Sequence, residues 1–300
     1  MKKGGIVVIG STNVDMVIVG RKIPVAGETV SGGKLMVNPG GKGANQAVAV
    51  ARLSARRGAC TFIAKVGDDV FGRETSARMR KDGIDAKLVV DRRERSGTAL
   101  ILVDPKGQNV ISVALGANGT LSPKDIAPFR KDIEGAAALL MQLETPLATV
   151  LAAAKWAKAK GVPVILNPAP AAKLPRELYG CLEWITPNET EAELLTGVKV
   201  TDAASASRAV DVFLRRGVRH VVITMGSKGV YCGDCRRLCP AKKVKAVDCV
   251  AAGDTFNGAF AVALAEGKCC KDAIAFAQKA AAISVTRPGA QASVPFRKEI

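Results

Sequence analysis

The chain has 300 residues, of which 48% are hydrophobic and 24% are charged, an ordinary composition for a globular protein. Its formal net charge is +17, but the basic residues occur as scattered pairs such as Arg56-Arg57 and Lys242-Lys243. Without a long basic block or interleaved aromatic residues, we expect no nucleic-acid partner. No apolar stretch reaches the roughly 18 residues that a membrane span needs, so we expect no membrane partner either.

The first residues and the cysteines indicate the cellular compartment. A short apolar run at 6–9 follows Met1-Lys2-Lys3 and is too brief for a secretion signal, so we expect a cytoplasmic protein. Three of the eight cysteines lie in CGDCRRLC at 232–239, which opens with a C-x2-C spacing. The chain has one histidine and no second C-x2-C pair, so reduced thiols are favoured over a zinc or iron–sulfur site, which stays the alternative.

Short apolar runs alternate with amphipathic segments along the chain. The runs predict buried strands at 5–10, 61–66, 137–141, 163–166, 183–186 and 220–224. The segments between them predict helices at 43–56, 70–82, 122–134, 146–160, 188–196 and 203–216, followed by an Ala-rich helical tail over 253–286 that breaks near Gly267-Lys268. Such alternation predicts an α/β fold, an open and mostly parallel Rossmann-like sheet with helices on both faces.

Two segments interrupt this alternation. Residues 14–37 and 96–114 are rich in β-type residues, and Asp104-Pro105-Lys106-Gly107 is a good hairpin turn. We expect these strands to form a small sheet beside a single domain that covers residues 1–300. The small sheet is either a lid over a cleft or an extension of the sheet edge.

Polar residues follow the first predicted strand directly. Asn13 and Asp15 are two positions apart on an extended segment, so their side chains point the same way. Open α/β sheets bind ligands at the carboxyl ends of their strands, where this segment lies. The alternative is a turn that faces solvent.

The next informative segment is glycine-dense and leads into a helix. It reads NPGGKGANQA at 38–47, and Lys42 and Asn45 are one helical turn apart, able to face one ligand. Its glycines permit close approach to a ligand, although a plain turn before a helix is the alternative. The segment is not the GxxxxGK[ST] phosphate-binding loop, which the chain lacks.

A third segment, AAGDTFNG at 251–258, opens the helical tail. Its small residues expose backbone N–H groups at a helix start, which is an anion-binding arrangement. Asp254 lies in this first turn, where an acid that merely caps the helix is the common alternative.

Together the three segments resemble the ribokinase (PfkB-type) family of sugar kinases over essentially the whole chain. Family members carry GGKGAN, found here at 40–45, and DT-x-AAGD-x-F, which stands here as DCVAAGDTF at 248–256. Cys249 replaces the usual Thr of the second signature. The decapeptide at 38–47 is similar to the ribokinase branch rather than to the fructokinase or adenosine kinase branches. The resemblance implies ATP-dependent phosphorylation of D-ribose at its 5-hydroxyl.

The resemblance also implies a role for individual residues. Asp254 is expected to be the general base, and the N–H groups of Ala251, Ala252, Gly253 and Asp254 are expected to bind the transferring phosphoryl group. The sugar hydroxyls are expected to be held by Asn13, Asp15, Gly41, Lys42, Asn45, Glu144 and Asp254.

Nucleotide and metal sites follow from the same resemblance. Asn188 and Glu191 match the family's N-x-x-E, expected to organise Mg²⁺ through water, although an N-capped helix is the local alternative. The ATP contacts are expected from Thr224, Gly226, Ser227, Lys228, Gly229, Gly253 and Gln278, with Asn257 a weaker candidate. A monovalent cation, K⁺, is expected near Asp248, Val250, Ser284, Arg287, Gly289 and Ser293, several of them acting through backbone oxygens.

Other functions stay open at this point. A deoxyribokinase or nucleoside kinase of the same family would share the base and the phosphate-binding loop, although Asp15 favours a sugar with vicinal hydroxyls. A non-catalytic sugar-binding regulator is the third reading, and the intact Asp254 argues against it because a binder needs no base. We also expect a homodimer formed through the lid strands, since open sheet edges pair readily.

Overall fold

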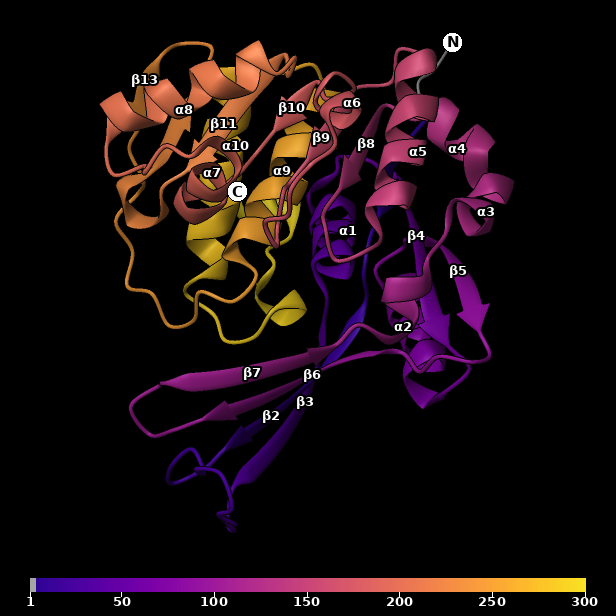
Figure 1. Cartoon of the computed structure of the whole chain (residues 1–300), viewed down its shortest axis with the longest axis vertical. Coiled ribbons are helices and arrows are strands. Elements are labelled where there is room, and N and C mark those ends of the chain that lie inside the picture. The colour runs from indigo at the N-terminus through magenta and orange to yellow at the C-terminus, as the bar shows by residue number, and fades with distance from the viewer. Residues whose placement is uncertain (1–3) are drawn as a thin grey trace.

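The central sheet of the chain is mostly parallel, as predicted. In the computed structural model, which describes residues 4–300, it is built from β1 (Ile6–Ile9), β4 (Cys60–Gly67), β5 (Asp85–Asp91), β8 (Ala138–Met141), β9 (Val164–Leu166), β10 (Trp184–Ile185), β11 (His220–Thr224), β12 (Val230–Cys232) and β13 (Arg237–Cys239). Their spatial order is β13-β12-β11-β10-β9-β8-β1-β4-β5 (Figure 1). The strands from β11 to β5 are parallel, whereas β12 and β13 form an antiparallel hairpin at one edge.

Helices cover both faces of this sheet. One face carries α3 (Pro123–Ile126), α4 (Arg130–Glu134), α5 (Leu147–Ala159), α6 (Arg176–Tyr179), α7 (Glu189–Thr196) and α8 (Ala203–Arg215), and the other carries α1 (Lys42–Leu53), α2 (Val70–Lys81), α9 (Ala252–Ala265) and α10 (Cys270–Ser284). Strand β1 serves both cores, because Val7 and Ile9 join the first while Ile6 and Val8 join the second. Among residues 4–300, no helix combines the length and apolar composition that crossing a membrane requires.

Three details of the predicted elements are wrong. The first helix stops at Leu53 instead of 56, because Ser54 is extended, with ψ at 142°. The predicted helix 122–134 is broken into α3, a short 3₁₀ turn and α4, and Pro128 lies in that turn, where it has no N–H to donate. Strand β5 was not predicted. It lies at the outer edge of the sheet, where it pairs with a single strand, β4.

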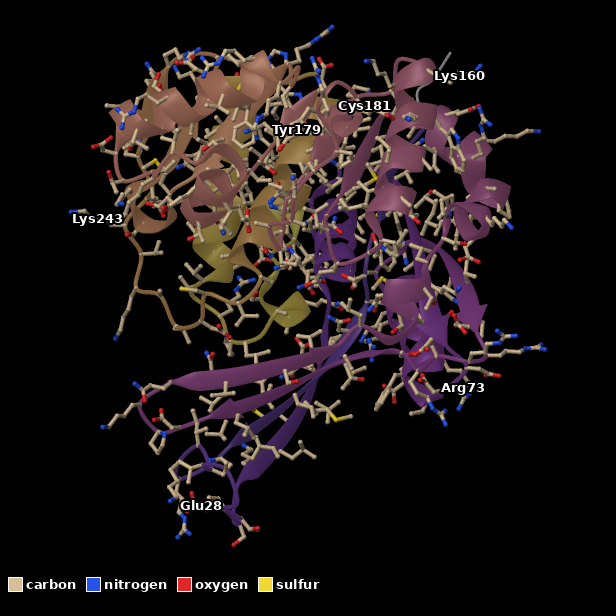
Figure 2. All side chains as sticks on the ribbon, in the orientation of Figure 1. Glu28, Arg73, Lys160, Tyr179, Cys181 and Lys243 are labelled. Carbon is tan, nitrogen blue, oxygen red and sulfur yellow. The ribbon has the colours of Figure 1, made fainter. Side chains whose placement is uncertain are left out.

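The two interrupting segments form a separate four-stranded sheet, which we call the lid. It contains β2 (Asn13–Val19), β3 (Lys34–Gly40), β6 (Gly97–Val103) and β7 (Asn109–Ala114), in the order β3-β2-β6-β7. The predicted turn between β6 and β7 is confirmed: Gly107 has a φ of 80° and donates its N–H to the Asp104 carbonyl at 3.0 Å. The lid extends away from the body (Figure 1), and the side chains of its strands, with Glu28 near its tip, are drawn in Figure 2.

Candidate active site

The start of α9 presents a carboxylate and unpaired backbone donors together. Asp254 lies in the first turn and is 7% exposed. Among residues 4–300, no acceptor takes the N–H groups of Gly253 and Asp254, while Ala252 donates its N–H to the Cys249 carbonyl at 3.3 Å. Ala251 precedes the helix in the left-handed conformation, with φ at 58°, which turns the chain sharply into α9. This helix start therefore retains donors and a dipole that favour an anion.

The first turn of α1 holds the Asp254 carboxylate in place. Asn45 donates from Nδ2 to one carboxylate oxygen at 2.9 Å, and Gln46 donates from Nε2 to the other at 3.0 Å. The Asn45 Oδ1 atom is buried without a partner, so it remains able to accept a hydrogen bond. The two predicted segments, more than 200 positions apart in the sequence, thus meet at one carboxylate.

Burial and neighbouring charges change the pKa of the Asp254 carboxyl group. Burial raises the pKa of Asp254, an effect that the Lys42 ammonium and the amides of Asn45 and Gln46 partly oppose. Burial by itself would lower the pKa of Lys42, but the carboxylates around it, Asp254 first and Glu144 second, raise it on balance. A carboxylate with a raised pKa is a better proton acceptor than an exposed aspartate, and its charge is balanced by a nearby cation.

Asp254 and Lys42 line a cavity of about 250 Å³. Its other lining residues come from the ends of β9 and β11, from the start of α7 and from the α9 loop: Asn167, Ala169, Asn188, Glu191, Thr224, Cys249, Ala251, Ala252, Gly253 and Asn257. The cavity therefore lies at the carboxyl ends of the parallel strands, where the fold places ligands.

The residues predicted for sugar binding lie where the lid joins the body. Asp15 is partly buried on β2, and burial, followed by the charge of Glu144, raises its pKa to about 6 against the opposing effect of Lys42. Glu144 accepts hydrogen bonds from the Ser11 hydroxyl at 2.5 Å and from the backbone N–H of Lys42 at 2.9 Å. Asn13 accepts from the Asn118 amide at 2.8 Å. Polar groups from β2, α1 and the loop after β8 thus converge here.

The glycines of the decapeptide lie so close to other parts of the chain that a side chain would not fit. A Cβ on Gly40 would lie 2.2 Å from an Asp15 carboxylate oxygen, and one on Gly43 would lie 2.5 Å from the Ser11 nitrogen. Gly41 has a φ of 89°, and a Cβ there would lie 2.7 Å from the Asn13 nitrogen. These glycines therefore let β2, β3 and the start of α1 pack closely, and the approach of a ligand to them stays a prediction.

The nucleotide-side residues divide into two groups. Glu191 and Asn188 line the cavity and form the capping box of α7, with 2.8 to 3.0 Å hydrogen bonds between them. Burial raises the pKa of Glu191. Asn188, which follows β10, and Thr224, at the end of β11, form an isolated parallel β-bridge. Both residues line the cavity.

The other nucleotide-side residues lie outside the cavity lining. Lys228 donates to Glu189 at 2.9 Å and to the Thr201 carbonyl at 3.1 Å, and Gln278 donates to the Cys239 carbonyl at 3.0 Å. Gly226, Ser227 and Gly229 form the turn after β11 and are not among the lining residues.

Some of the residues predicted for a monovalent cation lie together. The Asp248 carboxylate accepts the N–H groups of Val250 at 2.9 Å and Gly289 at 2.8 Å, which joins the α9 loop to the turn after α10. The Asp248 N–H reaches the Val285 carbonyl, next to Ser284. Arg287 pairs instead with Glu299, and Ser293 donates to the Ala290 carbonyl. Among residues 4–300, no three His, Cys, Asp or Glu side chains are grouped to hold a metal directly.

Several site residues were given no role from the sequence. Gln46 stands inside the decapeptide, yet only the structure shows it on Asp254. Asn167 accepts a hydrogen bond from Gln46 at 3.1 Å, and Asn118 anchors both the Thr12 backbone and Asn13. Asn167 directly follows a predicted strand, and a polar residue at that position was a usable signal.

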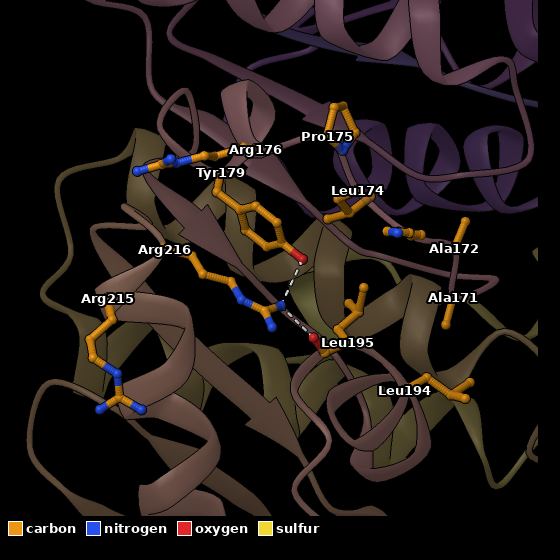
Figure 3. Close-up of a pocket in the computed structure, with 11 residues that line it drawn as sticks. Ala171, Ala172, Leu174, Pro175, Arg176, Tyr179, Leu194, Leu195, Arg215 and Arg216 are labelled. Atoms are coloured by element: carbon orange, nitrogen blue, oxygen red, sulfur yellow. Dashed lines mark hydrogen bonds between the residues drawn. The ribbon is translucent and has the colours of Figure 1, made fainter.

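A second cavity, of about 930 Å³, is larger but chemically different (Figure 3). It lies between α6, α7 and the end of α8, where Arg216 donates to the Tyr179 hydroxyl at 3.1 Å and lies over its ring. Its lining is apolar and basic, and none of the predicted site residues is in it. Size therefore does not identify the site; the carboxylate and the free amides do.

The fold and the site define an α/β kinase that transfers a phosphoryl group to a hydroxyl. Comparison with known proteins gives the family: residues 3–297 match the family of pfkB carbohydrate kinases, so the chain belongs to that family. Ribokinase of Haemophilus influenzae is 46% identical over 295 residues, covering 97% of this chain and 95% of that protein. The chain is thus an ATP-dependent sugar kinase.

Two further relatives inform the substrate question. Deoxyribokinase of Salmonella typhi is 37% identical over 294 residues, covering 97% of this chain and 95% of that protein. The structure of Arabidopsis thaliana ribokinase complexed with ribose and ATP is 32% identical, with a TM-score of 0.91, and covers 99% of this chain and 97% of that one. The similarity therefore spans the whole α/β body and the lid.

Proposed function

We propose that the chain phosphorylates D-ribose at the 5-hydroxyl with ATP. The observation that carries this proposal is the position of the Asp254 carboxylate. It is buried beside two free backbone N–H groups, that of Gly253 and that of Asp254. A sugar hydroxyl seated between them would give its proton to Asp254 as its oxygen attacks the γ-phosphorus. The N–H groups would stabilise the charge on the transferred phosphoryl oxygens, which is the main contribution that this reaction needs from a protein.

The sugar would be held by the polar groups at the lid junction. Asp15 and Asn45 offer acceptors, the latter through its unpartnered Oδ1, and Lys42 offers a donor. The Asn13 Oδ1 and the Glu144 carboxylate are fixed by internal hydrogen bonds and present their remaining lone pairs. This arrangement supports recognition of a molecule with several adjacent hydroxyls.

Mg²⁺ would accompany the ATP phosphates rather than sit in a protein cage. Because no group of direct metal ligands is present among the described residues, Glu191 and Asn188 would reach the ion through water, as Mg²⁺ commonly permits. ATP itself would lie against Thr224 and the α9 loop, with the 226–229 turn and Gln278 farther out. Mg²⁺ would neutralise charge on the phosphates when bound.

A sugar panel tests the proposal. Purified protein is assayed with ATP and Mg²⁺ against D-ribose, 2-deoxy-D-ribose, D-fructose and adenosine. We expect kcat/KM to be highest for ribose and the product to carry phosphate on the 5-oxygen by ³¹P-coupled NMR. Preference for deoxyribose would assign the chain to the activity of its deoxyribokinase relative, and no phosphorylation of any sugar would favour a binding protein.

Potassium dependence tests the cation site separately. The loop tied down by Asp248 leads directly into the free amides, so a K⁺ ion held by nearby carbonyls would orient them. We expect kcat in KCl to exceed kcat in NaCl at equal ionic strength. Equal rates in the two salts would show that the cation site is absent.

The lid also supports the proposed homodimer. Because side chains alternate along a strand, Asp15 lies on one face of the lid and Ile18, Leu35, Val37, Leu100 and Val110 share the other. These apolar side chains are between 42% and 60% exposed. A second copy of the chain would cover them, since an apolar face of this kind is costly in water.

A cytoplasmic location agrees with the eight cysteines, none of which is in a disulfide among the described residues.

A further inference from the structure

Three cysteines meet at the sheet edge opposite to β5. Cys232 ends β12, Cys235 lies in the turn to β13, and Cys270 opens α10. The Cys232 sulfur lies 2.8 Å from that of Cys235 and 3.4 Å from that of Cys270. Nothing in the kinase chemistry uses these residues, and none of the three lines the active-site cavity.

The spacing of the sulfurs argues against a metal site. Two thiolates on one tetrahedral zinc, each about 2.3 Å from it, would lie roughly 3.8 Å apart. The Cys232–Cys235 sulfurs are much closer than that and approach the distance from which an S–S bond of about 2.05 Å forms. No fourth ligand completes a shell, since residues 4–300 contain no group of side chains placed to hold a metal.

The surroundings make Cys232 the thiolate of the group. The hydrogen bond from Cys270, followed by those from Cys235 and the backbone N–H groups of residues 234 and 235, lowers the pKa of Cys232 to about 5. The hydrogen bond that Cys235 makes to Cys232 raises the pKa of Cys235 to about 11. The hydrogen bond between Cys270 and Cys232 raises the pKa of Cys270 as well. Cys232 is fully buried, whereas Cys235 is exposed to solvent. One thiol is therefore accessible and its neighbour is ready to react.

We propose that Cys232 and Cys235 are a modification site, a dithiol that a low-molecular-weight disulfide oxidises reversibly across the hairpin turn. In the first step the exposed Cys235 attacks the small disulfide R–S–S–R, forming Cys235–S–S–R and releasing one RSH with the proton of Cys235. In the second step the Cys232 thiolate attacks the Cys235 sulfur, the bond between Cys235 and the small thiol breaks, and the second RS⁻ leaves and takes its proton from water. The thiol of Cys235 and the thiolate of Cys232 lose two electrons and one proton in total, and the small disulfide gains the two electrons.

Cys270 has a positioning role in this exchange. Its S–H donates to Cys232 and stabilises the thiolate that performs the second step. The start of α10, where Cys270 lies, favours negative charge as well. Replacing it should slow closure of the intramolecular bond and let the Cys235–S–S–R intermediate accumulate.

The test uses the full-length reduced protein in buffers of increasing oxidised-to-reduced glutathione ratio. After acid quenching and N-ethylmaleimide alkylation, the tryptic peptide 229–236 contains both cysteines. We expect it to lose two hydrogens and both alkylation sites at ratios that leave Cys181, beside α6 (Figure 2), alkylated. Reduced glutathione in excess should restore both sites.

Matched variants separate the roles of the thiols. The exposed Cys235→Ser should abolish the internal bond, Cys270→Ser should retain it but accumulate the glutathione adduct on Cys235, and Cys181→Ser should behave like the parent. Circular dichroism checks that each variant is folded. The proposal is overturned if the parent stops at a glutathione adduct on Cys235, if Cys232 links to Cys270 instead, or if the purified protein carries one zinc per chain that blocks alkylation until a chelator removes it.

Discussion

The proposed mechanism depends on Asp254, whose environment is unlike that of a simple helix cap. Its two carboxylate oxygens are each held by an amide from α1, so the carboxylate has one orientation relative to the free N–H groups of α9. A cap in solvent would have neither the burial nor the raised pKa. Geometry and pKa both suit a proton acceptor at neutral pH.

Asp254→Asn should lower kcat by about 10²-fold or more, because the amide cannot accept the proton. Ribose binding by calorimetry should change far less, since the side chain keeps its size. Asp202→Asn is the matched control, because Asp202 also begins a helix but lies at α8, and Asn is as good a cap there. Full activity in Asp254→Asn would refute the mechanism.

Asp15 predicts a pH effect on sugar binding. Its pKa of about 6 lies above the ordinary value of 3.8, so the carboxylate is charged at pH 7.5 and becomes protonated as the pH falls through 6. Losing a charged acceptor for the sugar should raise the KM for ribose about tenfold, the equivalent of one charged hydrogen bond.

The measurement is KM for ribose between pH 5 and 8 in the parent and in Asp15→Asn. The variant should have a high KM with no inflection near 6. An identical pH profile in both proteins would show that Asp15 does not titrate in sugar binding.

At the scale of elements, the site depends on how closely α1 and α9 pack. Gly258 of α9 lies against α1, and a Cβ there would be 2.5 Å from the Ala49 Cβ and 2.9 Å from the Gln46 carbonyl. The two helices carry the two halves of the site, Asn45 and Gln46 on one and Asp254 on the other. Their separation therefore controls the hydrogen bonds that orient the carboxylate.

Gly258→Ala should lower the free energy of unfolding in urea by about 1–3 kcal/mol, the usual cost of overpacking. It should also lower kcat more than it raises the KM for ribose, because the base moves. Gly180→Ala is the control, since its Cβ would meet only an ordinary contact at 3.8 Å. Unchanged stability and kcat would mean that α1 and α9 can move apart without affecting the fold or the position of Asp254.

At the scale of the whole molecule, the proposed sugar site and the proposed dimer interface share the lid. One face bears Asp15 and the other bears Ile18, Leu35, Val37, Leu100 and Val110, so a partner on that second face would stiffen the sheet that carries Asp15. Leu100→Glu should raise the Kd of the dimer at least about thirtyfold, because a buried unpaired charge costs roughly 2 kcal/mol or more.

Sedimentation equilibrium measures this Kd, and Leu214→Glu is the control, since Leu214 is also exposed but lies on α8, at the end of the body opposite to the lid (Figure 1). A parent protein that stays monomeric at micromolar concentration would contradict the dimer. A Leu100→Glu dimer as tight as the parent would place the interface elsewhere.

Local structure and the available chemical groups could be predicted from the amino-acid sequence. Hydrophobic runs, caps and turn residues act over a few positions, so most strands, the lid hairpin at Asp104–Gly107 and the split between α9 and α10 were predictable. The conspicuous segments at 38–47 and 251–258 indicated a kinase before any contact was known. Where the local signal was weak, as in the edge strand β5, the prediction failed.

The contacts of each of those residues depend on the folded chain and could not be predicted. The amides of Asn45 and Gln46 on Asp254, the purpose of the glycines at 40–43 and the meeting of Cys232 with Cys270 all join segments distant in the sequence. Burial, pKa and long-range hydrogen bonds arise from packing of the complete chain, which no local window contains. Residue type sets which chemistry is available, and packing sets the position and charge state in which it acts.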